Sequence, residues 1–170
     1  MRADCHMHTY FSGDSEAKPE DMVLAAIDKG LEAICFTDHE DIDYFCDDIE
    51  FVFDPETYFK ELGALKEKYK EKLDIRIGVE FGLQPHLAKK AKAFTNPYDF
   101  VIGSMHVVGG KDPYYPEFFE GISDEEAYRM ALRETIADIR AVADFDVLGH
   151  LDYVVRYGKH REQEYSYGRF

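Results

Sequence analysis

The stretch Arg2-Ala3-Asp4-Cys5-His6-Met7-His8 sets the interpretation of the whole chain. It has the length and pattern of a short β-strand that ends in two histidines at positions i and i+2. Alternate side chains of a strand point to the same face, so His6 and His8 can bind one common ion. Neutral imidazoles are good ligands for zinc, manganese and iron. One such pair is a weak signal by itself, because these histidines more often face solvent.

Length and composition favour a single globular domain. The chain has 170 residues, of which 45% are hydrophobic and 15% aromatic, so it can bury a substantial core and is not a disordered chain. Its formal net charge of -15 argues against a broad surface for nucleic acid or for an anionic membrane. We therefore expect one domain over residues 1–170, with neither long nucleic acid nor a membrane as a partner.

The sequence is typical of a cytoplasmic protein. It contains no apolar run of membrane-spanning length, and its start lacks the regions of a signal peptide. Its three cysteines, Cys5, Cys35 and Cys46, form no CxxC pair, and their odd number gives no disulfide framework. Cys5 and Cys35 lie in apolar strand-like segments, where we expect buried, unreactive thiols.

Strand-like and helix-like segments alternate along the chain. After the first strand, the expected strands are Leu31–Thr37, Asp74–Val79, Phe100–Met105 and Phe145–Leu148. The expected helices run from Pro19 to a stop at Gly30, from Asp54 to about Leu73, from His86 to Phe94, and from a capping box at Ser123 and Glu126 to about Ala143. This alternation predicts right-handed crossovers and a parallel sheet with α/β architecture.

Metal-binding residue types occur at the carboxyl ends of the expected strands, where functional groups of parallel sheets gather. They are His6, His8, His39, Glu80, His106 and His150. Any one of these histidines could equally be a packed or hydrogen-bonded residue. The full set at matching strand ends favours a metal centre with open positions for water and substrate. The two other histidines, His86 and His160, fall outside this pattern, and we expect no functional role for them.

Short motifs follow one another at these strand ends in a fixed order: His6-Met7-His8, Thr37-Asp38-His39, Gly78-Val79-Glu80, Ser104-Met105-His106 and Leu148-Gly149-His150. They resemble the successive motifs of the PHP (polymerase and histidinol phosphatase) superfamily. The segment Asp146–Tyr153 is most similar to the histidinol-phosphatase branch. The resemblance covers essentially the whole chain. It implies a distorted (β/α)7 TIM-like barrel of parallel strands that holds two or three divalent metal ions, either zinc, manganese or iron.

The resemblance also implies a role for each ligand. His6 and His8 would bind a first metal, which Glu80 would bridge to a second metal completed by His106 and His150. A third metal would be bound by His39 and by a residue in the loop after the first strand, a position that Asp14 matches. The competing interpretation of Asp14 is an ordinary turn aspartate.

The implied chemistry is hydrolysis of a phosphate ester by in-line attack of a metal-bridging hydroxide, with no protein nucleophile. Arg156 lies a few residues beyond His150 and could bind the substrate phosphate as a planar fork, or could be an ordinary surface arginine. Asp41 or Asp43 could face a cationic amine of the substrate or act as a general acid. The acidic run around them leaves the choice between the two open.

One family motif does not occur in this chain. The PHP pattern includes a later Asp-x-His, whereas this sequence ends at Phe170 without one. Five strands cannot close such a barrel, and an open parallel sheet exposes an unpaired edge. We therefore expect an incomplete barrel, either a fragment or a truncated variant that covers its edge by self-association or with a swapped segment. The segment Glu162–Phe170 is typical of the first turns of a helix, which favours the fragment.

The function expected from the sequence is metal-dependent hydrolysis of a phosphate monoester. The resemblance implies L-histidinol phosphate as the small phosphorylated substrate, which would be cleaved to L-histidinol and phosphate in histidine biosynthesis. One alternative is a phosphodiesterase or exonuclease of the same superfamily that acts on small nucleotides. Another is a non-catalytic, truncated metal-binding fragment.

Overall fold

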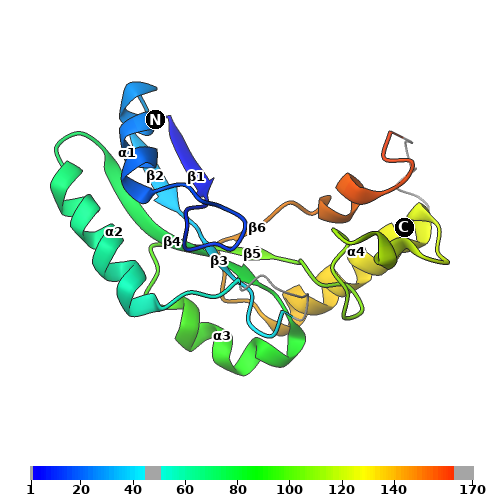
Figure 1. Cartoon of the computed structure of the whole chain (residues 1–170). Coiled ribbons are helices and arrows are strands. Elements are labelled where there is room, and N and C mark those ends of the chain that lie inside the picture. The colour runs from blue at the N-terminus through cyan, green and yellow to red at the C-terminus, as the bar shows by residue number, and fades with distance from the viewer. Residues whose placement is uncertain (1, 45–50, 163–170) are drawn as a thin grey trace.

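The computed structural model describes residues 2–44 and 51–162, and its centre is a parallel sheet (Figure 1). The strands are β1 (Ala3–Met7), β2 (Ala33–Phe36), β3 (His39–Glu40), β4 (Asp74–Gly82), β5 (Phe100–Ser104) and β6 (Val147–Leu148). The helices are α1 (Pro19–Asp28), α2 (Pro55–Tyr69), α3 (Ala88–Thr95) and α4 (Asp124–Ala141), with the 3-10 helices η1 (Pro85–Leu87), η2 (Pro116–Phe119) and η3 (Tyr153–Tyr157).

The sheet is a curled half-barrel. Its strand order is β1-β2-β4-β5-β6, every pair is parallel, and β3 pairs with β4 beyond the end of β2. The helices follow one another along the outer side of the curled sheet (Figure 1). In the described part of the chain β1 and β6 are the two edges, because neither has a second partner strand. The predicted α/β fold, an incomplete TIM-like barrel of parallel strands, is thereby confirmed.

Local sequence signals explain where the helices begin and end. Pro19 occupies the first turn of α1, where the missing N–H has no intrahelical acceptor to lose. Gly30 follows this helix with φ of +67°, a left-handed conformation that glycine adopts without strain. At the start of α4, Ser123 accepts a hydrogen bond from the backbone N–H of Glu126, and the Glu126 carboxylate accepts one from the Ser123 backbone N–H. The predicted capping box is therefore confirmed.

The strands differ from the predicted ones mainly near the carboxyl edge of the sheet. β4 continues to Gly82, beyond the predicted end at Val79, because β3 and β5 pair with its last residues. The pair His39–Glu40 was not predicted to be a strand, since two residues carry no periodic signal. β6 is only two residues long, and α2 ends at Tyr69 rather than near Leu73.

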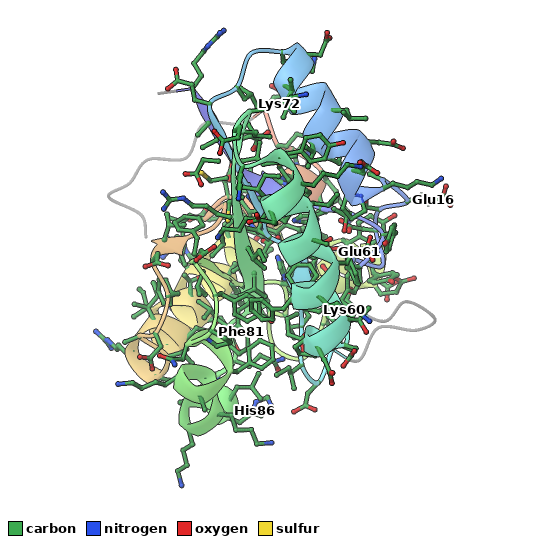
Figure 2. All side chains as sticks on the ribbon, turned by 90° about the vertical axis from the view of Figure 1, so that its left-hand side faces the viewer. Glu16, Lys60, Glu61, Lys72, Phe81 and His86 are labelled. Carbon is green, nitrogen blue, oxygen red and sulfur yellow. The ribbon has the colours of Figure 1, made fainter. Side chains whose placement is uncertain are left out.

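β4 is the centre of the core. Val79 and Phe81 are at most 1% exposed, and they pack in a cluster that includes Leu83 and Leu87. A second cluster joins α1 and α2 to β2 and the first half of β4. Figure 2 shows Phe81 in the interior, whereas Lys60 and Glu61 of α2 point outward. Exposed and buried residues alternate at the start of β4, whereas every residue from Ile77 to Gly82 is buried, as expected for a strand covered on both faces.

The cysteine predictions hold in part. Cys35 is buried in β2, whereas Cys5 is exposed, so the prediction of a buried Cys5 thiol is wrong. The physical reason is that Cys5 lies on β1, an edge strand whose residues from Ala3 to His6 are exposed. Cys46 lies outside the described residues. No described helix has both the length and the apolarity needed to cross a bilayer.

Gly78 and Gly63 offer a matched test of the packing at β4. A methyl group at Gly78 would lie 2.5 Å from the carbonyl oxygen of Phe100 and 2.8 Å from Sγ of Cys35. At Gly63, within α2, it would meet nothing within 4 Å. We predict that Gly78→Ala lowers the free energy of unfolding by about 1–3 kcal/mol. Gly63→Ala should raise it by about 0.5–1 kcal/mol through helix propensity. Urea unfolding measures both, and equal effects would contradict the packing.

Asp138 of α4 gives a prediction on pH. It is 1% exposed, neither carboxylate oxygen has a hydrogen-bond partner, and burial, with a smaller effect of Glu134, raises its pKa to about 7. An aspartate in the unfolded chain titrates near pH 4. The stability that Asp138 contributes is therefore complete below about pH 4 and is lost as the pH rises through 7.

We compare the free energy of unfolding of Asp138→Asn with that of the wild type at pH 4 and at pH 8. We predict that this difference shifts in favour of the variant by about 1–2 kcal/mol as the pH rises from 4 to 8. Urea unfolding of both proteins at the two pH values measures this gain. The control is Asp144→Asn, at an exposed position. A difference between Asp138→Asn and the wild type that does not change with pH would show that Asp138 is ionised normally.

Candidate metal centre

Glu80 lies at the centre of the candidate site, near the carboxyl end of β4. It pairs in register with His39 of β3 on one side and with Ile102 of β5 on the other. The side chain is fully buried, and its Oε1 accepts a hydrogen bond of 2.6 Å from the hydroxyl of Ser104. A buried carboxylate is costly unless it is paired, so its neighbours decide whether this position is tolerated.

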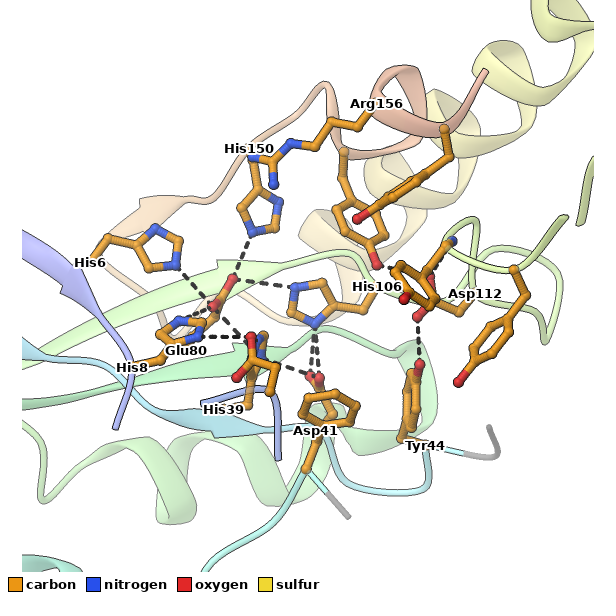
Figure 3. A pocket seen from close by; sticks show the side chains of 16 residues that line it. His6, His8, His39, Asp41, Tyr44, Glu80, His106, Asp112, His150 and Arg156 are labelled. Atoms are coloured by element: carbon orange, nitrogen blue, oxygen red, sulfur yellow. Dashed lines mark hydrogen bonds and ion pairs between the residues drawn. The ribbon is translucent and has the colours of Figure 1, made fainter. Parts of the chain in front are cut away.

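Five imidazoles surround this one carboxylate (Figure 3). The nitrogen-to-oxygen distances to Glu80 are 2.9 Å for His6, 2.9 Å for His8, 2.8 Å for His150, 3.2 Å for His106 and 3.6 Å for His39. The carboxyl ends of parallel strands meet at one edge of the sheet, and this is why residues so distant in sequence converge. The structure thus brings together all six residues that were predicted at strand ends.

A buried aspartate organises the loop after β1. Asp38 Oδ1 accepts hydrogen bonds from the backbone N–H of Thr9, at 2.5 Å, and from the hydroxyl of Ser12, at 3.1 Å. The Ser12 hydroxyl in turn accepts a hydrogen bond of 2.8 Å from the backbone N–H of His39. These contacts hold the loop against the end of β2 and place Asp14 near the histidines.

Asp14 is brought into the cluster as predicted. Its Oδ2 lies 3.3 Å from Nδ1 of His8 and 3.6 Å from Nε2 of His39. The carboxylate is 44% exposed, so it lies on the open side of the group, opposite the buried Glu80. Asp14 therefore has the position of a ligand as well as that of a turn residue.

The structure separates the two aspartates that the sequence left as alternatives. Asp41 is buried, and its carboxylate lies 2.9 Å from Nδ1 of His106 and 3.4 Å from Nδ1 of His39. Asp43 has a positive φ of 60° and points away, where it contacts Nε2 of His86 at 2.9 Å. Asp43 does not line the cavity. Figure 2 shows His86 at the periphery of the molecule, away from the candidate residues.

The electrostatic potential among the candidate ligands favours protonated histidines and bound cations. Burial opposes ionisation of Glu80, yet contacts from the histidines, of which His106 contributes most, hold the pKa of its carboxyl well below the ordinary value. Burial also lowers the pKa of His8 and His39, but hydrogen bonds, first from Asp14, outweigh it and raise both values to about 9. Carboxylates thus dominate the local field, as expected for a site that binds cations.

The residues fit a site for divalent metal ions. Four groups each place three ligand atoms within 4.8 Å of one another: His6, His8 and Glu80; His8, Asp14 and His39; His39, Asp41 and His106; Glu80, His106 and His150. Imidazole nitrogens and carboxylate oxygens are the donors that zinc, manganese and iron accept. Nε2 of His8 and Nδ1 of His39 are buried and face the carboxylates of Glu80 and Asp41, at 2.9 Å and 3.4 Å, without the geometry of a hydrogen bond. Both nitrogens therefore have positions suited to metal ligands.

A cavity of about 560 Å3 opens above the cluster. Beyond the candidate ligands its wall is mainly aromatic, formed by Tyr44, Phe51, Tyr114, Tyr115, Tyr153 and Tyr157. Arg156 also lines it, and among the described lining residues it is the one lysine or arginine. Its guanidinium lies 5.9 Å from the ring centroid of Tyr153.

Sequence reasoning did not identify Tyr44, Asp112 and Tyr153, which line this cavity. Asp112 is buried although it follows Gly109-Gly110-Lys111, a run typical of an exposed turn. No pattern in the sequence distinguishes these residues from ordinary loop residues, because their contacts join segments 41 and 68 positions apart.

The PHP domain family matches residues 4–168. The chain is 35% identical to a histidinol-phosphatase of Lactococcus lactis subsp. lactis over 98% of its length, and 33% identical to a probable histidinol-phosphatase of Clostridium acetobutylicum over 100%. It covers 62% and 65% of these two relatives, which is less than two thirds of their length.

Solved structures show the same architecture. A crystal structure of histidinol phosphate phosphatase from Lactococcus lactis, complexed with zinc, L-histidinol and phosphate, superposes with a TM-score of 0.90 at 36% identity, covering 99% of this chain and 64% of that one. A putative histidinol phosphatase from Listeria monocytogenes shares the fold with a TM-score of 0.81 at 21% identity, over 96% of this chain and 71% of that one. This chain therefore belongs to the PHP domain family.

Proposed function

We propose that this chain forms the catalytic centre of a metal-dependent phosphatase that hydrolyses L-histidinol phosphate to L-histidinol and phosphate in histidine biosynthesis. The observation that carries the proposal is the convergence of five imidazoles on the buried carboxylate of Glu80. In the reaction the ester P–O bond breaks, and an oxygen atom from water forms the new bond to phosphorus.

The relatives support the choice of substrate. The Lactococcus lactis enzyme, whose structure contains zinc, L-histidinol and phosphate, matches nearly the whole of this chain. The cavity above the cluster, about 560 Å3, is large enough for a small phosphorylated molecule. Arg156 is the one lysine or arginine among the described residues of its lining, and this sparse positive charge disfavours long nucleic acid.

The metal roles follow from the four groups of ligand atoms. We propose that His6 and His8 would hold one ion, that His106 and His150 would hold a second with Glu80 as a ligand common to both, and that Asp14 and His39 would hold a third. Two or three ions of zinc, manganese or iron would be bound. Such ions lower the pKa of water and neutralise phosphate oxygens.

Other side chains position the reactants. We propose that Arg156 binds the substrate phosphate, because its planar guanidinium can donate two parallel hydrogen bonds. Asp41 accepts from His106, so it orients this imidazole and fixes the nitrogen that is left for the metal. Of the two aspartates, the contacts favour Asp41, because Asp43 points away from the cavity.

Other features remain predictions from the sequence alone. They are the single domain over residues 1–170, the cytoplasmic location, and self-association through the open sheet edges. A nucleotide phosphodiesterase and a non-catalytic metal-binding fragment are the alternatives that the experiments below separate from the proposed phosphatase.

One prediction of the proposed function concerns the activity of the chain. With Zn2+ or Mn2+ present, we expect the chain to release phosphate from L-histidinol phosphate faster than from p-nitrophenyl phosphate, and to leave a dinucleotide intact. His8→Ala and Glu80→Ala should abolish the reaction and lower the bound metal, measured by mass spectrometry of the protein's metal content. Each substitution removes a ligand from the shared centre.

The matched control for these variants is His86→Ala, because His86 is a peripheral histidine that pairs only with Asp43 among the described contacts. It should keep the wild-type rate and metal content. Cleavage of the dinucleotide in preference to the phosphomonoester would favour the phosphodiesterase. Metal binding without turnover of any of the three substrates would favour the non-catalytic fragment.

Another prediction of the proposed function concerns Arg156. We expect Arg156→Ala to lower kcat/KM for L-histidinol phosphate by about 10- to 100-fold, because a charge-assisted hydrogen bond is lost. Arg156→Lys should restore only part of the loss, since an ammonium cannot form the planar fork. The control is Arg133→Ala, at an exposed position of α4. Equal rates for wild type and Arg156→Ala would identify Arg156 as a surface residue.

A further inference from the structure

Asp112 joins three segments at the rim of the metal centre. It lies in the loop after β5 and is 5% exposed. Its Oδ2 accepts a hydrogen bond of 2.5 Å from the hydroxyl of Tyr44, which lies between β3 and α2. Its Oδ1 accepts one of 2.8 Å from the hydroxyl of Tyr153 in η3, and another of 2.8 Å from the backbone N–H of Tyr114. Both carboxylate oxygens are thus occupied by neutral donors.

One of the two tyrosines supports two candidate ligands. The ring of Tyr153 lies with its centroid 5.4 Å from that of His106 and 5.4 Å from that of His150. Both imidazoles contact Oε1 of Glu80. Figure 3 shows Asp112 in the outer layer of the site, beyond His106. A fixed Tyr153 ring therefore limits how these two imidazoles can rotate.

The other tyrosine acts through one further ring. Tyr44 packs edge-to-face against Phe51, with 5.1 Å between the centroids. Phe51 packs in the same way against His39, also at 5.1 Å. The second oxygen of Asp112 is thereby linked through aromatic contacts to a third imidazole, that of His39.

We propose that Asp112 is a positioning residue for the metal centre, acting through Tyr44 and Tyr153; we call these three residues the tyrosine brace. Metal binding needs ligand atoms held within a few tenths of an ångström, and an imidazole reaches this precision only when packing fixes its ring. The brace supplies that packing from the loop after β5, from Tyr44 after β3 and from the 3-10 helix η3. The inference rests on the metal-binding role proposed above.

The competing explanation is that Asp112 only stabilises its own loop, through its contact with the backbone of Tyr114. The two explanations differ in what Tyr153→Phe and Tyr44→Phe should do, because each removes one hydroxyl of the brace and keeps the contact between Asp112 and the backbone of Tyr114. Asp112→Asn is the conservative variant. An asparagine can still accept from Tyr153 and Tyr114 through its oxygen, and its amide can donate to the hydroxyl of Tyr44. It therefore keeps the brace while removing the charge, whereas Asp112→Ala removes the brace.

The experiment measures binding of Co2+ to the chain by the visible absorption bands of the bound ion, which report ligand geometry. We expect Asp112→Ala to weaken Co2+ binding by about 10-fold or more and to change the band shape, whereas Asp112→Asn stays close to the wild type. Asp54→Ala is the control for general destabilisation. Asp54 caps α2 through the backbone N–H of Thr57, and its loss should lower Tm without changing Co2+ binding.

A second measurement uses the imidazole resonances of the metal-free protein in NMR spectra. The shift changes expected for Asp112→Ala are confined to His39, His106 and His150, with His86 and His160 unchanged. Tyr153→Phe should shift only His106 and His150, and Tyr44→Phe only His39. These patterns depend on the individual contacts of the brace, so a loss of global stability would not produce them.

Two results would overturn the inference: wild-type Co2+ binding and imidazole spectra in Asp112→Ala, or equal losses in Asp112→Ala and Asp112→Asn. Co2+ binding by the wild type without phosphatase activity would contradict the proposed function but not the brace. If the wild type binds no Co2+, the proposed metal centre fails, and the imidazole spectra alone decide whether the brace positions the rings.

Discussion

The structure depends on one buried charge, the carboxylate of Glu80, and on the ring of imidazoles that makes its burial tolerable. An unpaired carboxylate at this depth would cost several kcal/mol. Contacts with five histidines and with the hydroxyl of Ser104 stabilise that charge, and they come from β1 and the residue after it, the first residue of β3, the end of β5 and the loop after it, and the segment after β6. The histidines that stabilise the buried carboxylate are also the candidate metal ligands. The same contacts therefore serve the stability of the fold and the proposed metal binding.

The parallel sheet brings the candidate ligands together in one place. Because all its strands run in one direction, every strand that ends at this edge delivers a side chain to the same region. The outer layers then restrict these side chains: Asp38 holds the loop after β1, Asp41 contacts His106 and His39, and Asp112 holds two tyrosines against the cluster. Three buried aspartates thus lie behind the ligands in a chain whose net charge is already -15. A cation in the centre would relieve part of the resulting repulsion.

Much of the fold could be predicted because its signals are local. The capping box at Ser123, the proline at the start of α1 and the apolar run of β2 each act within a few residues, and the structure contains all three elements. The errors arose where pairing between strands decides the outcome. β3 exists because its two residues meet the end of β4, and Cys5 is exposed because β1 lies at an edge of the sheet.

The sequence by itself determined the order of strands and helices, the parallel sheet and the identity of the candidate ligands, since strand periodicity and residue type suffice for these. Only the tertiary structure distinguished the positions of Asp41 and Asp43: Asp41 contacts His106 and His39, whereas Asp43, which has a positive φ, contacts His86 and does not line the cavity. Only the tertiary structure revealed the contacts of Asp112, whose partners Tyr44 and Tyr153 lie 68 and 41 positions away in the chain. Contacts over such distances depend on how loops fold over the end of the sheet, and no local pattern encodes them.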